Sequence, residues 1–185
     1  MKQLLTLALG VVIGASSFYF GSAFLGQHSA DQPYAGQQTR VISSLSPKDI
    51  NQLENGEGWG LAKPAEFNGY PGPSHVLEFQ EELKLSVEQR TSIQNAFEAM
   101  SEKAKVLGVE LIESEAALDQ AFKSGAIDEM QLVKTLQLAE SARSKLRAVH
   151  LTAHLEVTPL LSDEQKKQYA QLRGYGGSHS AHTGH

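Results

Sequence analysis

The sequence contains no cysteine, which excludes disulfide bonds, thiolate metal sites, cysteine nucleophiles and the cysteine-linked anchor of bacterial lipoproteins. Aromatic residues make up only 7% of the chain, which is low for a β-rich domain. The formal net charge is −5 with histidine neutral, so the composition offers no basic surface for nucleic acid. The 185 residues are enough for one domain with a tail at each end.

The sequence also lacks the patterns typical of enzymes. It has no glycine-rich phosphate loop, no His-Glu-x-x-His pattern, and no recognisable Ser/His/Asp arrangement. We therefore predict that the protein is not an enzyme and that it uses no organic cofactor.

One long apolar run is present, at the N-terminus. Lys2 is the only charged residue before the run over residues 4–25, which is about long enough to span a bilayer. Small residues suitable for cleavage occur at 21–23 and 29–30. Residues 1–26 are therefore either a cleaved signal peptide or a retained membrane anchor. Both alternatives predict a periplasmic protein, soluble or tethered to the inner membrane.

The longest predicted element is a helix over residues 85–122. Apolar residues recur along it with alternating gaps of four and three, which is typical of a helix that packs along another helix. Ser86 and Gln89 form the pattern of a capping box at its start, and Gly125 marks its end. The apolar stripe consists of Ile93, Phe97, Met100, Ala104, Leu107, Leu111 and Leu118.

A second long helix is predicted after a short turn at residues 123–126. Its stripe has the same spacing and consists of Leu132, Leu136, Ala139, Leu146, Ala153, Val157 and Leu160, with Arg143 and His150 at its two polar places. Two long helices joined by a short turn predict an antiparallel hairpin, so the expected fold class is all-α. Short flanking helices are expected at 46–55, 74–84 and 161–174.

These elements divide the chain into four segments. Residues 1–26 are the signal peptide or anchor, and residues 27–45 form a polar, turn-rich linker. Residues 46–174 form the helical domain. Residues 175–185 are mostly glycine, serine and histidine and are predicted to be a disordered tail.

The pattern Leu-Ser-x-Glu-Gln occurs twice, once at each end of the hairpin. Its capping residues are Leu85, Ser86 and Gln89 in the first copy and Leu161, Ser162 and Gln165 in the second. Two such caps behind an export segment resemble the Spy/CpxP family of periplasmic helical proteins, including its heavy-metal sensor and resistance members of the CnrX and ZraP type. That family has threonine where this chain has serine, and both provide a capping hydroxyl. The resemblance covers roughly residues 74–175.

The resemblance implies a bent helical hairpin, usually dimerised, with a concave face. Some members of the family hold unfolding proteins without ATP. Others bind nickel, cobalt, zinc or copper and report the metal to an envelope stress system. The expected partners are therefore a second copy of the chain and either a membrane-bound signalling protein or unfolded clients. Contact with the membrane is expected only through the N-terminal segment, if it is retained.

Histidines provide the candidate metal ligands. His150 and His154 are four residues apart, so both rings lie on one helix face, where one ion can bridge them. The resemblance places them where the sensors have a His-x-x-x-Met pair. It also implies a ligand near His75 and a carboxylate after the first motif, for which Glu88 and Glu98 are weak candidates. The alternative is that His150 packs within the stripe and His154 faces solvent at its edge.

The tail adds a second candidate metal site. His179, His182 and His185 are evenly spaced by three, and imidazole is a common ligand for late first-row metals such as Zn, Ni, Co and Cu. The alternative is a tail that is merely solvated.

Two further surfaces are predicted on the hairpin. Leu151 and Leu155 lie opposite the apolar stripe, which indicates a partner surface, first for a dimer and second for clients. Glu113, Glu115 and Asp119 are interpreted as a solvated charged face.

The function that this sequence favours is that of a periplasmic metal-binding protein, acting as a heavy-metal sensor or resistance accessory in envelope stress. The alternative is an ATP-independent chaperone or stress adaptor that binds unfolding proteins on an apolar face. The histidine content favours the first.

Overall fold

The computed structural model describes residues 33–175. The chain divides into two units, Met1–Gly36 and Gln37–His185, and the helical fold lies in the described part of the second. The predicted signal or anchor segment, and the tail histidines at 179, 182 and 185, lie outside the described residues. Within residues 33–175 no helix has both the length and the apolar character needed to cross a membrane.

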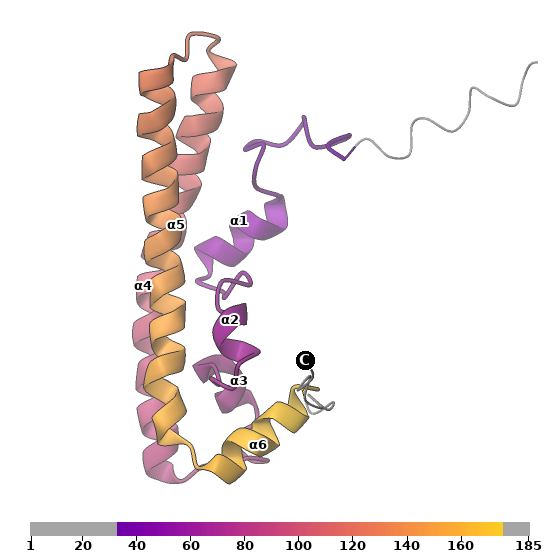
Figure 1. Ribbon diagram of the computed structural model, residues 1–185, viewed down its shortest axis with the longest axis vertical. Coiled ribbons are helices and arrows are strands. Elements are labelled where there is room, and N and C mark those ends of the chain that lie inside the picture. The colour runs from indigo at the N-terminus through magenta and orange to yellow at the C-terminus, as the bar shows by residue number, and fades with distance from the viewer. Residues whose placement is uncertain (1–32, 176–185) are drawn as a thin grey trace, which may run out of the picture. The chain divides into compact units, whose positions relative to one another are not determined.

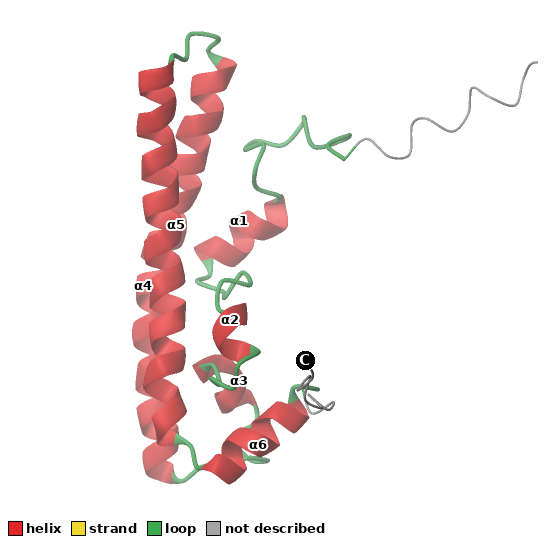
Figure 2. Ribbon diagram, viewed as in Figure 1, coloured by secondary structure: helices red, strands yellow, loops and turns green. Residues whose placement is uncertain are grey.

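Two long helices dominate the fold. Helix α4, Val87–Lys123, and helix α5, Glu129–Val157, pack side by side as an antiparallel hairpin (Figures 1 and 2). The side chain of Asp128 caps α5 by accepting a hydrogen bond from the backbone N–H of Gln131. Gly125 has a φ of +66°, a left-handed conformation that glycine adopts without strain, and it reverses the chain after α4. The predicted all-α hairpin is confirmed.

Short helices flank the hairpin. Helices α1 (Pro47–Glu54), α2 (Lys63–Glu66) and α3 (Pro73–Glu78) follow one another along one side of it (Figure 1). After α5, the short 3₁₀ helix Thr158–Leu160 contains Pro159, which ends regular α-helical bonding, and α6 (Asp163–Leu172) then turns away from the hairpin. The sequence did not predict α2, which has only four residues.

The buried apolar residues form two clusters. One lies where α1 covers the hairpin and comprises Ile42, Leu45, Leu53, Ala104, Leu111, Ala142 and Leu146. The other lies where α3 and α6 meet the open end of the hairpin and comprises Val76, Leu83, Leu85, Ile93, Val157, Leu161 and Tyr169. The predicted stripe thus supplies most of the hairpin's share of both clusters, with Ala142 as an unpredicted addition. The segment before the hairpin supplies the rest of the first cluster, and the segments on both sides of the hairpin supply the rest of the second.

Two predicted boundaries differ from the structure. The linker was predicted to extend to residue 45, but Ile42 and Leu45 are buried because they cover apolar residues of the hairpin. The helix predicted over residues 74–84 ends at Glu78, and Lys84 has a φ of +50°. A helix continuing into α4 would place residues two apart on different faces, whereas Leu83 and Leu85 both enter the core.

The interpretation of Glu113, Glu115 and Asp119 as a solvated face is wrong for two of them. Glu115 is buried and accepts hydrogen bonds from Arg143 Nη2 (2.8 Å) and Ser44 Oγ (2.7 Å). The side chain of Asp119 accepts a hydrogen bond from Ser43 Oγ. The two carboxylates are not solvated because the segment before α1 lies against this face of α4 and its serines donate hydrogen bonds to them.

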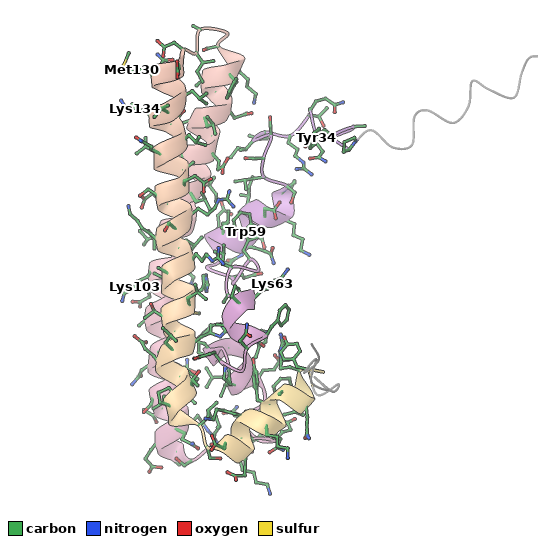
Figure 3. The ribbon with its side chains drawn as sticks, viewed as in Figure 1. Tyr34, Trp59, Lys63, Lys103, Met130 and Lys134 are labelled. Carbon is green, nitrogen blue, oxygen red and sulfur yellow. The ribbon has the colours of Figure 1, made fainter. Side chains whose placement is uncertain are left out.

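Part of the apolar stripe remains exposed near the tip of the hairpin. Leu136 is 45% exposed, although the sequence placed it in the stripe. Figure 3 shows Met130 and Lys134 there with side chains pointing away from the helix pair. These side chains stay exposed because two helices bury only the narrow strip where they face each other, and no further helix of the described chain reaches the tip.

The two Leu-Ser-x-Glu-Gln motifs contact each other. In each motif the serine and the glutamine form a reciprocal capping box, as predicted. Gln89 Nε2 also donates to Leu160 O (2.7 Å) and to Gln165 Oε1 (2.9 Å). Gln165 Nε2 donates in return to Leu83 O and to Gln89 Oε1, both at 3.1 Å. The paired amides therefore join the starts of α4 and α6, and each motif needs an amide because it must both accept and donate.

Replacing Gln165 by glutamate is expected to destabilise the fold by about 1–3 kcal/mol. The carboxylate keeps the acceptor for the Ser162 N–H but loses both donated bonds, and it faces the oxygens of Gln89 and Leu83. Urea unfolding followed by circular dichroism measures the loss. The matched control is Gln171→Glu on the exposed side of the same helix, which should change stability by less than about 0.5 kcal/mol. Equal stability of the two variants would contradict the prediction.

Candidate functional site

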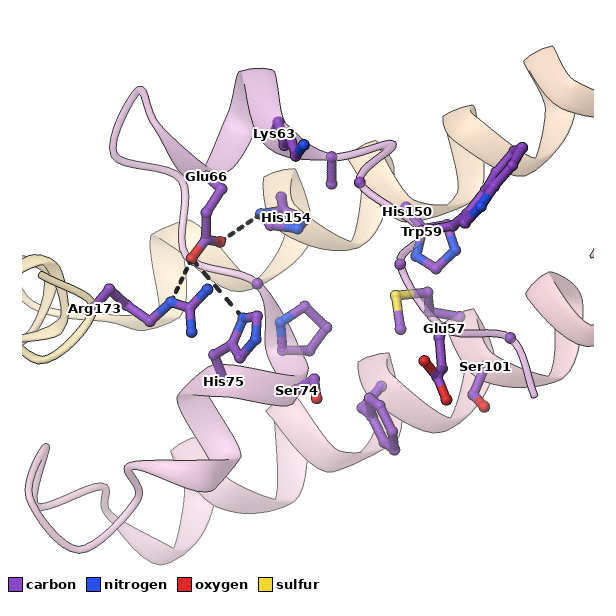
Figure 4. Close-up of a pocket in the computed structure, with 18 of the residues that line it drawn as sticks. Glu57, Trp59, Lys63, Glu66, Ser74, His75, Ser101, His150, His154 and Arg173 are labelled. Atoms are coloured by element: carbon purple, nitrogen blue, oxygen red, sulfur yellow. Dashed lines mark hydrogen bonds and ion pairs between the residues drawn. The ribbon is translucent and has the colours of Figure 1, made fainter. Parts of the chain in front are cut away.

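A pocket of about 590 Å³ lies between the hairpin and the segment that carries α1, α2 and α3 (Figure 4). The hairpin supplies His150 and His154 from α5 and Phe97 and Met100 from α4. The facing segment and the end of α6 supply its other charged and aromatic lining residues, among them Trp59, Glu66, His75 and Arg173. The pocket therefore exists only because a segment early in the chain packs on the hairpin.

Glu66 is the polar centre of this pocket, although it is only 9% exposed. Its Oε1 accepts hydrogen bonds from the hydroxyl of Tyr169 (2.6 Å), from Arg173 Nε (2.9 Å) and from the hydroxyl of Tyr175 (3.2 Å). His154 Nδ1 lies 3.9 Å from the other oxygen, Oε2. The buried carboxylate is thus neutralised by a guanidinium group and held by two phenols. Burial, followed by the bond to Glu66, raises the pKa of Tyr169 far above its ordinary value.

His154 is held in one orientation. It is 7% exposed, and its Nδ1 lies 2.7 Å from Tyr70 O, a distance at which Nδ1–H donates to this carbonyl. Because a carbonyl can only accept, Nδ1 is the donor in this bond, and in the neutral ring the lone pair is on Nε2. A Cβ on Gly72 would lie 2.8 Å from Nε2, so the glycine provides space beside that nitrogen. The alternative that His154 faces solvent is wrong, because α2 and the turn after it cover this face of α5.

His150 is buried one turn earlier on α5. It is 3% exposed, and its Nε2 has no hydrogen-bond partner among the described residues. Burial, and secondarily the nearby charge of His154, lower the pKa of His150 below its ordinary value, so the ring is neutral at pH 7. A buried nitrogen without a partner is costly in a purely structural role.

The predicted metal ligands come together only in part. His150, His154 and His75 all line the pocket, and His75 Nδ1 lies 3.9 Å from Glu66 Oε1 (Figure 4). Within residues 33–175, however, no three His, Asp or Glu side chains are grouped closely enough to hold a metal ion. Burial, and secondarily the charge of Arg173, lower the pKa of His75.

Comparison with known proteins identifies the hairpin. A family model described as LTXXQ motif family protein matches residues 74–173, which include both motifs and the whole of α4 and α5. The chain belongs to the LTXXQ motif family. This family includes Spy/CpxP-like periplasmic proteins. No curated protein and no solved structure matched the chain.

The LTXXQ family match begins at residue 74, so it leaves out the part of the pocket lining that comes earlier in the chain. Helices α1 and α2, with Trp59 and Glu66, precede residue 74 and lie outside it, whereas His150 and His154 lie within it. Glu88 and Glu98, the weak candidates for the carboxylate ligand, are both exposed on α4 and do not line the pocket. The carboxylate that faces the histidines is Glu66, which the sequence did not indicate because its short helix has no periodic pattern.

The loop that walls the pocket of this LTXXQ family chain is fixed by Trp59. Trp59 has a φ of +42°, an uncommon backbone conformation for a bulky residue. Its Nε1–H donates to Asp49 Oδ1 (2.8 Å), and the guanidinium of Arg143 lies 5.1 Å from its ring centre. Asp49 also completes the capping box of α1 with Ser46. Helix α1, the loop and the hairpin are thereby joined at one point.

Replacing Asp49 by asparagine is expected to lower stability by about 1–2 kcal/mol at pH 7. Hydrogen bonds from Ser46, and next from Trp59, hold the pKa of Asp49 below its ordinary value in the folded state. The carboxylate therefore contributes stability above pH 4, and this contribution disappears as the pH falls through its folded-state pKa. Denaturant unfolding of both proteins between pH 7 and pH 3 measures the effect. A stability difference that does not shrink with falling pH would contradict this account.

Proposed function

We propose that this LTXXQ family chain is a periplasmic metal-binding protein that acts as a heavy-metal sensor or resistance accessory in envelope stress. The observation that carries the proposal is the pair of buried histidines in the pocket. His154 has its Nδ1 committed to Tyr70 O, and His150 Nε2 has no partner within the described chain. A histidine that binds a metal ordinarily donates its other ring N–H to a carbonyl or a carboxylate, as His154 does.

The pocket contains side chains of a chemical type that binds metal ions. His150 and His154 would bind the ion from α5, and His75 lies on the same pocket. The imidazoles suit Zn, Ni, Co or Cu. The tail histidines at 179, 182 and 185 are proposed as a second, weaker site, because a chain must be ordered before it can bind.

A sensor must convert binding into a change of shape. The pocket joins the hairpin to the segment with α1 and α2, so an ion held on α5 alters the fit between them. Metal must bind one arrangement better than the other, or nothing is signalled. We propose that the changed surface is read by a membrane-bound signalling partner, and that residues 1–26 deliver or tether the chain to the periplasm.

Calorimetric titration of the full chain with Zn²⁺, Ni²⁺, Co²⁺ and Cu²⁺ tests the proposal, with mild detergent present because of the apolar N-terminal run. A second protein, in which His179, His182 and His185 are all serine, removes the tail site. We expect micromolar or tighter binding that persists in the second protein and is lost with His154→Ala. Binding that disappears with the tail histidines, or that leaves circular dichroism and self-association unchanged, would contradict the sensor proposal.

We also propose that the chain forms a homodimer through the surface that contains Leu151 and Leu155. Leu155 is 59% exposed, and Leu151 is half-buried. Alanine at both positions is expected to weaken self-association roughly tenfold, because two leucines lose apolar burial. Sedimentation equilibrium measures this change. Leu172→Ala on α6 is the control and should have no effect, and an unchanged dimer in the double variant would remove this surface from consideration.

Chaperone activity is the second candidate function, and the exposed apolar residues toward the tip of the hairpin favour it. These are Val106, Val109, Phe122, Met130, Val133, Leu136 and Leu138, each at least 43% exposed. The test is whether stoichiometric amounts of the chain slow the aggregation of a chemically reduced model protein such as lactalbumin. We expect Val133→Ser with Leu136→Ser to abolish any such effect. No slowing by the unmodified chain would remove this candidate.

A further inference from the structure

The pocket is larger than a metal site requires. Its volume of about 590 Å³ falls within the range of small-molecule sites, which is about 300–1,000 Å³. Most of the surface that lines it is apolar, as in such sites. The apolar lining residues include Ala62, Met100, Trp59, Phe67, Phe97 and Tyr175. A single ion bound to histidines leaves most of this space and its aromatic surface unexplained.

The charged groups of the pocket are either paired or exposed. Glu66 lies toward one end of the pocket, where Arg173 balances its charge at 2.9 Å, and His150 lies toward the other end (Figure 4). The other lining residues with a full charge are Glu57 and Lys63, and both are exposed. An organic ion would therefore lose its hydration without meeting a buried opposite charge, which favours an uncharged ligand.

His150 provides the polar group at its end of the pocket. It is 3% exposed, and its Nε2 is buried with no hydrogen-bond partner among the described residues. In a neutral imidazole this nitrogen either carries a proton or has a lone pair, depending on the tautomer. A hydroxyl group suits both forms because it can donate and accept, whereas a carbonyl or an ether can only accept.

The lining combines one adaptable side chain with one fixed ring. Because Nε2 of His150 is covered, a ligand reaches it only when a neighbouring side chain shifts, and the unbranched Met100 on the same pocket can do so at small cost. Trp59 is held in place, since its Nε1–H donates to Asp49 and its ring lies 5.1 Å from the guanidinium of Arg143. A fixed aromatic ring is preorganised to receive a second ring.

The distance between the fixed ring and the buried nitrogen matches a substituted phenol. Arg143, which stacks on Trp59, precedes His150 by seven residues on α5, or about 10 Å along the helix. A phenol with a short alkyl chain has a similar length. Trp59 is only half-buried, so a ring packed against it removes further apolar surface from water.

We propose that the pocket binds small uncharged phenols, with the hydroxyl group bonded to Nε2 of His150 and the apolar part of the molecule packed against Trp59. This inference goes beyond the metal-binding proposal and does not depend on it. A phenol and a metal ion would compete for the same nitrogen of His150, so each ligand is tested in the absence of the other.

The test titrates the full chain, in mild detergent and with EDTA to remove metals, with 4-propylphenol and with 4-propyltoluene. The second compound has a methyl group in place of the hydroxyl. Trp59 is the only tryptophan, so its fluorescence reports binding directly when it is excited at the red edge of its absorption. We expect the unsubstituted chain to bind the phenol with a sub-millimolar Kd.

The variant His150→Leu removes the proposed hydrogen-bond partner. We expect the ratio of the two affinities, phenol over toluene, to fall by at least about tenfold in this variant, because a site built around a hydroxyl loses its preference with its partner. Detergent takes up each ligand equally in every sample, so its effect cancels in this comparison. Ser101→Ala is the matched control, because it removes another polar group from the same lining and should leave the ratio unchanged.

The outcomes are independent of the metal titration. An equal ratio in the His150→Leu protein, or no change in Trp59 fluorescence up to millimolar phenol, overturns the phenol site and leaves the metal-binding proposal standing. Should His150→Leu fail to fold by circular dichroism, nuclear Overhauser contacts in the unsubstituted chain decide. Contacts between 4-propylphenol and the Trp59 indole support the site, and binding without such contacts overturns it.

Discussion

Replacing Gly108 by alanine is expected to destabilise the fold by about 2–3 kcal/mol, although alanine favours a helix by about 1 kcal/mol over glycine. The reason is the close approach of α1 to α4. A Cβ at position 108 would lie 2.1 Å from Leu53 O and 2.8 Å from the Leu53 carbonyl carbon. Both are backbone atoms, so no side chain can rotate away and the two helices must separate. That movement also disturbs Leu53, which is buried in the core cluster beneath α1.

Urea unfolding followed by circular dichroism measures the effect of Gly108→Ala. Val109→Ala is the matched control, because it also introduces alanine into α4 but at a position that is 43% exposed. The control should change stability by less than about 0.5 kcal/mol. A Gly108→Ala protein as stable as the parent would mean that α1 does not pack against α4 as described here.

Replacing Glu66 by alanine is expected to cost about 3–4 kcal/mol, the largest loss among these variants. The substitution leaves Tyr169 and Tyr175 without their acceptor and Arg173 without its counter-charge. Tyr169 is 2% exposed, so its hydroxyl cannot turn to bulk water. The loss involves the segment that precedes the LTXXQ family match, since Glu66 is one of the residues that join that segment to α6.

Three variants separate the parts of this effect in thermal or urea unfolding. Tyr169→Phe removes one hydrogen bond and should cost about 1–2 kcal/mol. Arg173→Met should cost less in the Glu66→Ala background than in the parent, because the buried charge pair is already broken. Glu57→Ala, an exposed carboxylate on the same pocket, is the control and should be nearly neutral. Additive losses for Glu66 and Arg173 would contradict the coupling described here.

The segment over residues 37–73 changes what the hairpin presents to partners. It buries Ala104, Leu111 and Leu146 beneath Ile42, Leu45 and Leu53. Apolar residues that a bare hairpin would expose are thus covered by the chain itself. What stays open is the exposed tip and a pocket with buried histidines, which is why we place metal binding before chaperone activity.

The sequence by itself determined the elements whose cause is local. The length of α4 and α5 follows from a four-three apolar spacing over many turns, and the caps at Ser86 and Ser162 follow from bonds within four residues. The reversal at Gly125 likewise depends on one residue. The fold class, the hairpin and the family resemblance could therefore be predicted without coordinates. The histidine pair on α5 could also be predicted, since helical spacing alone places both rings on one face.

Only the tertiary structure decided what surrounds those histidines. Glu66 belongs to a four-residue helix that no periodicity marks, and it meets His154 and Tyr169 across 88 and 103 positions of the chain. Whether His154 faces solvent or a carbonyl depends on where residues 41–73 pack, and that is settled by long-range burial of Ile42, Leu45 and Leu53. Such contacts leave no repeating pattern in sequence, because each joins one residue to a distant one.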